Sequence, residues 1–439
     1  MNITFPNFRR TEAEYRPNEF AIYLYNVNIN EVYGNKDNVK KNVDSFRLLV
    51  HEIRHYTDHI STFWGLNNIM MHNIAINARI NEDIDNYHYL YDYYKLNKQL
   101  YYDEYYTLIT NDSNVNKYTY GDDPWRFDIN LIHKYDNTGR LNKENPLICI
   151  NFYKSIKDNR FLARVPLSIV SILEVNAIFE ELMFKSNILN DLPKDESIVE
   201  NMLFQKEIFE ELIYNKDLVV YNVIVHLTAS VLNITDLMEA LSIASKIGTV
   251  SLNLTSEDLE NMKVCDFILN YNNEGKEYAK NFIRQHDLGF VFLNLLFNYR
   301  KKFNSTRIYD IDDLLRCSNL KDKDIILHSL KTIFADGLTE ILKNNSFRYV
   351  YSDHISRGIE ILEKKGLDGS KSPAIEMFNG VKYRPFVFFK DIDYELIDID
   401  KDSFVKNGPY LTNYQQIEFI QYSDFFNSLL DEFINACDK

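Results

Sequence analysis

The residues with the most evident chemistry lie in the segment HEIRHYTDHISTFWG, which begins at His51. It holds three of the chain's ten histidines, His51, His55 and His59, with Glu52 and Asp58 between them. Residues four apart on an α-helix lie about 40° apart around its axis and one turn along it. His51 and His55 can therefore direct their imidazoles at one zinc ion. Glu52, about 100° from His51, is placed to act as a general base on a water molecule.

The flanking residues suggest how such a site would be supported. Asp58 follows His51 by seven residues, so it lies about 20° from it around the axis and could fix the tautomer of a ligand imidazole. His59 lies about 80° from His51, which favours a flanking polar residue over a third ligand. The alternative for the segment is a surface helix whose charged side chains pair three and four residues apart.

A third ligand is expected on another helix, and two candidates exist. Glu174 sits among apolar residues in SILEVNAIFEE, where an unpaired carboxylate would be costly, and Ala177 is small enough to let two helices approach. Glu181 falls on the same face two turns later and suits a supporting role beside a ligand. Glu82 is closer in sequence to His55, but water can satisfy its polar surroundings, so Glu174 is preferred.

The motif formed by His51, Glu52 and His55 resembles the active-site motif of the zincin metallopeptidases. The resemblance implies that the two histidines bind Zn²⁺ and that Glu52 is the catalytic base. The zincin subgroup with a glycine and a third histidine or aspartate after the motif is excluded, because Asp58 and Ser61 occupy those positions. The gluzincin type remains, in which a glutamate on a downstream helix is the third ligand.

This resemblance implies a zinc-dependent metallopeptidase that hydrolyses peptide bonds in a protein or peptide substrate. One departure is the distance of 119 positions between His55 and Glu174, which is longer than gluzincins usually show and requires an insertion. Two alternatives remain open: a non-catalytic metal-binding or interaction protein, and a zinc amidohydrolase acting on a small molecule. No regulatory partner is identified.

The elements that must position these residues follow from periodicity and turn signals. Apolar spacing from Asn38 predicts a helix that carries the motif and ends near Gly65. The segment LICINF is expected to be a buried strand of a hairpin. By analogy with the zincin fold, it is also expected to be the edge strand of a sheet, to which a peptide substrate adds as a further strand. We further expect one or two strands, or a strand and a turn, over 19–34 and helices over about 66–109 and 164–184, the second with Pro166 and Ser168 at its start. A linker is expected over 190–197, followed by mostly helix over 198–345 with breaks near Gly248, Asn272 to Gly275 and Asn304. A strand over 383–389 and a terminal helix from about 414 complete the expectation.

The predicted fold class is α+β, mainly helical, with a small antiparallel sheet or hairpin. A zincin-like core is expected over 1–195, with a Tyr-rich helical and hairpin insertion at about 86–145. A helical region over 196–345 and a mixed region over 346–439, with a strand and a terminal helix, complete the chain.

Composition narrows the cellular setting. The net charge of -15 disfavours nucleic acid and anionic membranes as partners. The four cysteines are widely spaced and include no C-x-x-C pair, which is typical of a reducing compartment. The first residues contain no apolar secretion signal, so a cytoplasmic location is predicted. Abundant Asn, Ile, Lys and Tyr are typical of an AT-rich bacterial genome.

Overall fold

The protein is described from a computed structural model. The described residues are 3–4, 12–28, 31, 42–81, 85, 87–98, 106–111, 123–135, 141–271, 274–343, 346–370, 385–390 and 413–437. The chain forms two compact units, each assembled from separate stretches. The first unit comprises Met1–Arg9, Leu100–Phe179 and Ser186–Ile326, and the second comprises Arg10–Gln99, Glu180–Lys185 and Leu327–Lys439.

A five-stranded antiparallel sheet, in the order β1-β4-β7-β6-β5, belongs to the first unit. The predicted hairpin is confirmed, because β5 and β6 pair along their lengths. LICINF lies in β6 and is buried as expected, but the prediction of an edge strand is wrong: β6 has β5 on one side and β7 on the other. The strands are β1 (Ile3–Thr4), β4 (Leu108–Thr110), β5 (Arg126–Tyr135), β6 (Leu141–Tyr153) and β7 (Phe161–Pro166).

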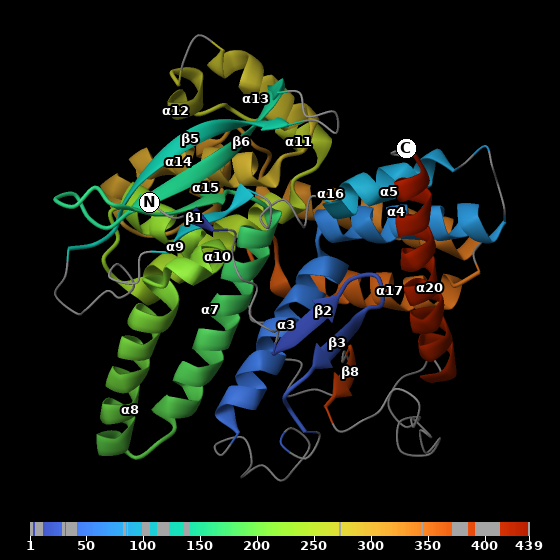
Figure 1. The fold of residues 1–439 in the computed structure, drawn as a ribbon, viewed down its shortest axis with the longest axis horizontal. Coiled ribbons are helices and arrows are strands. Elements are labelled where there is room, and N and C mark those ends of the chain that lie inside the picture. The colour runs from blue at the N-terminus through green and yellow to red at the C-terminus, as the bar shows by residue number, and fades with distance from the viewer. Residues whose placement is uncertain are drawn as a thin grey trace. The chain divides into compact units, whose positions relative to one another are not determined.

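Helices complete the first unit, with α9 against β7 and α13 against β6. Figure 1 shows α13 beside strands β5 and β6. The helices are α8 (Lys194–Glu207), α9 (Val219–Leu232), α10 (Leu237–Asn253), α11 (Ser256–Asn261), α12 (Asp266–Leu269), α13 (Gly275–Arg284), α14 (Leu288–Thr306) and α15 (Ile311–Cys317), with a π-helix, η4 (Ile208–Ile213), and a 3₁₀ turn, η5 (Lys216–Leu218).

Two expectations about this unit are wrong. The linker over 190–197 shrinks to a short turn, because α8 begins at Lys194. Gly248 does not break a helix but lies inside α10, where a Cβ atom would come within 3.1 Å of Asn176 and Ile172. Glycine is used at this position for close packing rather than for a turn.

The second unit has a three-stranded sheet of β2 (Ala13–Arg16), β3 (Ala21–Leu24) and β8 (Phe386–Phe389). β3 pairs with β2 antiparallel and with β8 parallel. Helix α3 (Val43–Ser61) packs against β2, β3 and α4 (Phe63–Ile80), and α17 (Arg348–Lys365) packs against α3 and α4. The remaining helices are α5 (His88–Lys98) and α20 (Asn413–Cys437).

Two long helices have residues in both units. Helix α7 (Ile169–Asn190) contributes Glu180–Lys185 to the second unit, and α16 (Lys323–Lys343) enters that unit at Leu327. The predicted start of α7 is confirmed: the Ser168 side chain accepts from the backbone N–H of Val170 and Ser171, which caps the helix. The sequence predicted three consecutive regions, whereas each compact unit combines separate stretches of the chain. The three regions therefore remain a prediction.

The helix carrying the motif ends earlier than predicted. α3 stops at Ser61 because Thr62 is extended, with φ −118° and ψ 159°, and its side chain caps the start of α4. Gly65 therefore lies in the first turn of α4. A Cβ atom there would overlap the His59 carbonyl oxygen, so glycine allows a tight corner between the helices.

The chain is mainly helical with small sheets, as predicted. Within the described segments, no single helix is long and apolar enough to cross a membrane. Two consecutive helical segments, Lys216–Leu232 and Leu237–Asn253, are long and apolar enough only when taken together, and the chain bends by 104° between them.

Candidate metal centre

Helix α3 is amphipathic, and this decides how it presents the motif. Phe46, Leu49, Val50 and Ile53 are buried on its apolar side. The His51 side chain keeps 13% of its surface exposed. The imidazole is therefore mostly enclosed by neighbouring side chains but still reaches solvent.

His51 and His55 point their Nε2 atoms at each other, 3.2 Å apart. Their rings are nearly perpendicular, with centroids 4.8 Å apart. Two imidazoles bound to one tetrahedral zinc ion at about 2.0–2.1 Å have their nitrogens roughly 3.3 Å apart. The pair therefore has the spacing that a shared zinc ion requires.

Helix α7 fixes which nitrogen of His51 faces this point. His51 Nδ1 lies 2.9 Å from Glu181 Oε2, and Arg47 Nε lies 3.0 Å from Glu181 Oε1. A carboxylate held by an arginine only accepts hydrogen bonds, so His51 Nδ1 carries the proton and donates. Nε2 is then the lone-pair nitrogen, which is the form of histidine that binds a metal.

Glu174 lies on α7 seven residues before Glu181, so helical geometry places it on the same side two turns earlier. One potential ligand atom from each of His51, His55 and Glu174 lies within 4.8 Å of the other two. Among the residues that the structure describes, this is the one such group of three or more histidine, cysteine or acidic side chains. The competing Glu82 lies outside the described residues, so the choice between the two stays a prediction.

Glu52, the expected base, is 5% exposed on α3 directly after His51. The catalytic role of Glu52 stays a prediction.

Asp58 has a different setting from the expected one. It is 0% exposed and forms ion pairs with Arg54 at 3.1 Å and with Lys365 on α17 at 2.7 Å. Burial alone would raise the pKa of Asp58, but the two cations hold it well below its usual range. Seven residues along a helix correspond to about 10 Å, which puts Asp58 two turns from His51 although both share one face. Its role in orienting a ligand histidine stays a prediction.

The Asp58 pairs belong to a buried network that ties three helices together. Arg54 also contacts Glu180 on α7 at 3.0 Å, so two cations and two carboxylates balance one another. Burial lowers the pKa of Lys365 to about 8, which the nearby Arg54 also favours, while Asp58 and Glu180 oppose it. We refer to Arg54, Asp58, Glu180 and Lys365 as the ion network.

His59 is occupied elsewhere. Its Nδ1 lies 2.7 Å from the Tyr15 hydroxyl and its Nε2 3.0 Å from Asn68 Oδ1, so both ring nitrogens have partners. Burial lowers its pKa to about 4. The histidine is therefore neutral inside an aromatic cluster. The expectation that it is a flanking polar residue and not a third ligand stays a prediction.

The sequence interpretation missed four residues around the centre: Arg47, Arg54, Glu180 and Lys365. Two of them carried a readable signal, because Arg47 precedes His51 and Arg54 precedes Asp58 by four residues. Lys365 lies 307 positions from Asp58, and no local pattern connects such residues.

Comparisons with known proteins give no relative for this arrangement. No family model matches the chain. No curated protein matches it, and no solved structure does.

Proposed function

We propose that the chain is a zinc-dependent hydrolase of peptide bonds, with His51, His55 and Glu174 as metal ligands. The observation that carries this proposal is the convergence of one ligand atom from each of these three side chains within 4.8 Å. The two Nε2 atoms stand at the separation expected for one zinc ion.

The chemistry would follow from the positions of the protein's own groups. A zinc ion at this centre would polarise the scissile carbonyl and lower the pKa of a water molecule. Glu52 takes a proton from that water and delivers it to the leaving amine. Glu181 holds the His51 ring in the tautomer that leaves Nε2 available, and the Arg47 guanidinium holds the Glu181 carboxylate in place.

The choice of a peptide substrate and of a zincin-like core rests on the motif alone. A helix with two histidines and a glutamate at these positions is the arrangement by which zincin metallopeptidases hydrolyse amide bonds. We propose the same reaction here, with a glutamate from a second helix as the third ligand.

The function is tested with the Glu52→Gln variant beside the wild type. The substitution keeps the shape of the side chain, but the amide accepts no proton, so the variant should fold and retain zinc. Hydrolysis should fall by about 10²-fold or more, measured as the rate of peptide cleavage in a protein substrate mixture. Equal rates in the two proteins would refute the mechanism. A wild type that binds zinc but cleaves nothing would favour a non-catalytic metal-binding protein.

A further inference from the structure

Helix α8 carries an exposed apolar stripe that the metal centre does not explain. Ile198, Val199, Met202 and Leu203 are 52%, 55%, 68% and 57% exposed. On a helix these four residues fall within about 140° of arc, so they form one face. Phe204 points the opposite way and is 5% exposed, which shows that α8 already has a separate inward side. Large apolar side chains gathered on one exposed face mark a contact surface.

The stripe is symmetric about a point midway between Glu200 and Asn201. Ile198 and Leu203 are equally far from that point, and so are Val199 and Met202. If a second α8 packs antiparallel on the first with its twofold axis at this point, Ile198 meets Leu203 of the other copy. Val199 then meets Met202. A surface of this kind is self-complementary in the way that a twofold interface requires.

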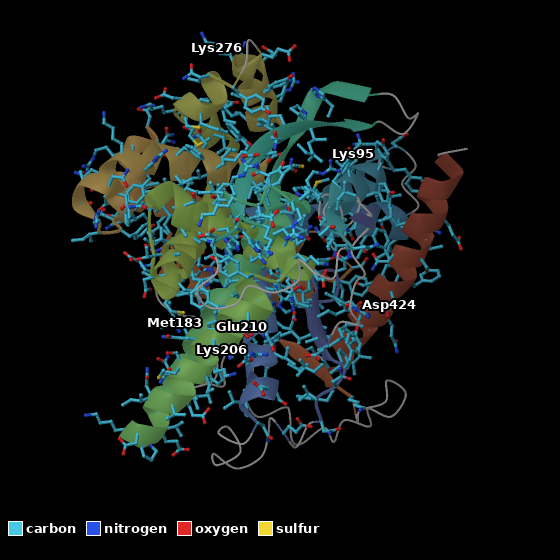
Figure 2. The ribbon with its side chains drawn as sticks, turned by 60° about the vertical axis from the view of Figure 1, so that its left-hand side comes forward. Lys95, Met183, Lys206, Glu210, Lys276 and Asp424 are labelled. Carbon is cyan, nitrogen blue, oxygen red and sulfur yellow. The ribbon has the colours of Figure 1, made fainter. Side chains whose placement is uncertain are left out.

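The charges at the ends of the stripe follow the same symmetry with opposite signs. Asp195 and Lys206 are both exposed, and along the helix they lie beyond the two ends of the stripe. Around the helix axis they lie about 60° and 80° from Ile198, near the centre of the 140° arc that the stripe covers. The antiparallel arrangement brings Asp195 of each copy to Lys206 of the other. Figure 2 labels Lys206 and Glu210, which lie near each other. Glu210 is a distant partner of Lys206 at 4.0 Å, and the Lys206 side chain remains 65% exposed.

From this pattern we infer that α8 is a self-association surface, on which a second copy of the chain packs its own α8 in antiparallel orientation. An anionic membrane is a poorer occupant, because Asp195, Glu196 and Glu200 are exposed around the stripe and would be repelled. A single pair of short helices buries less than a standard interface. The expected association is therefore weak and concentration-dependent, with Kd on the order of 10–100 µM. This inference does not depend on the proposed catalytic function.

The test is sedimentation equilibrium of the full chain over a concentration series that reaches about 200 µM, twice the upper end of the expected Kd range. The wild type should change from monomer to dimer. Met202→Glu should remain monomeric, because it places a charge in the centre of the stripe. Ile156→Glu is the matched control: Ile156 is 77% exposed outside α8, and its substitution should leave the dimer unchanged.

Charge reversal tests the antiparallel arrangement itself. Asp195→Lys and Lys206→Glu should each weaken the dimer, since each creates like-charge pairs across the interface. The double variant should restore it, because the pairs then form with exchanged signs. A wild type that is monomeric at every concentration would overturn the inference. So would a dimer that Met202→Glu leaves intact, or one that the double variant fails to restore.

Discussion

At the scale of single residues, the proposed metal binding depends on which histidine nitrogen is available. The Nδ1 proton of His51 is held by Glu181, so its Nε2 lone pair faces His55 Nε2 at 3.2 Å. The proposed shared cation rests on this arrangement of the two imidazoles, with Glu174 as a third potential ligand beside them.

Glu181 should therefore matter for metal affinity more than for folding. Glu181→Ala removes the partner of His51 Nδ1, and we expect zinc affinity to fall by about 10- to 100-fold without being abolished. Glu181→Gln keeps an acceptor for His51 and should recover part of the loss. Competition with a fluorescent zinc chelator measures both. Unchanged affinity in Glu181→Ala would mean that the contact with His51 has no part in metal binding.

Asp58 should matter for folding more than for metal affinity. Asp58→Asn leaves Arg54 and Lys365 buried without their shared anion, so we expect the free energy of unfolding to fall by about 3–5 kcal/mol. Zinc affinity of the folded variant should remain close to that of the wild type. Urea denaturation and the same chelator assay give the two values. A stable variant with weakened zinc binding would instead support the ligand-orienting role suggested by the sequence.

At the scale of elements, the motif helix is held by close approach as well as by the ion network. A Cβ atom at Gly358 of α17 would overlap the Ile60 carbonyl oxygen of α3, so only glycine lets these two helices cross at this distance. The Lys365–Asp58 pair joins the same two helices. The position of α3 therefore depends on a segment about 300 residues away in the sequence.

Gly358→Ala should destabilise the second unit by about 1–3 kcal/mol or more, because the helix backbones must separate to make room. Gly337 in α16 is the matched control. A Cβ atom there would meet Leu66 at an ordinary 3.5 Å, so Gly337→Ala should be neutral or stabilising by roughly 0.5–1 kcal/mol. Thermal unfolding compares the two variants. Equal effects would show that the α3–α17 crossing tolerates a methyl group.

Elements with a strong local signal could be predicted from the sequence, and contacts between distant elements could not. The periodicity around His51 and the capping residue Ser168 located α3 and α7, and turn signals located the β5–β6 hairpin. The end of α3 was misplaced because glycine is a usual helix-ending residue, whereas Gly65 allows the tight corner between α3 and α4. The parallel pairing of β3 with β8 joins residues more than 360 positions apart, for which a sequence pattern has no signal.

The candidate site divides in the same way. The H-E-x-x-H spacing indicated His51, Glu52 and His55, and the apolar setting of Glu174 indicated a carboxylate in need of a partner. The ion network could not be predicted, because no local sequence pattern connects Asp58 with Lys365, which lies 307 positions away. The burial of an aspartate depends on tertiary packing that a helical pattern does not report.

At the scale of the whole molecule, buried neutral histidines should make stability depend on pH. Burial lowers the pKa of His59 and His226 from 6.5 to about 4, and that of His72 to about 3. The unfolded chain binds protons at these histidines below pH 6.5, whereas the folded chain does not. Stability is therefore complete above pH 6.5 and is lost as the pH falls toward 4. Glu19 acts in the opposite direction, because burial raises its pKa from 4.5 to about 7. Between these values the folded chain holds a proton at Glu19 that the unfolded chain has released.

Burial lowers the pKa of His286 and His354 as well, so they act in the same direction. At least about two net protons are therefore taken up on unfolding, and the free energy of unfolding should fall by roughly 3 kcal/mol or more per pH unit between pH 6 and 4.5. Tryptophan fluorescence in urea measures it, since Trp125 stacks on His226 and Trp64 lies beside His59. His226→Gln should reduce this slope, whereas substitution of the exposed His328 by glutamine should not. A slope that is unchanged by His226→Gln would contradict this explanation.

The central claim is that His51, His55 and Glu174 hold one zinc ion, and metal stoichiometry tests it most directly. Purified wild type, Glu174→Ala and Glu82→Ala are dialysed against a zinc buffer, and the bound metal is counted by mass spectrometry. We predict one zinc ion per chain in the wild type and in Glu82→Ala, and loss of zinc in Glu174→Ala with the fold retained by circular dichroism. A wild type without stoichiometric zinc would contradict the claim. So would full zinc in Glu174→Ala together with its loss in Glu82→Ala.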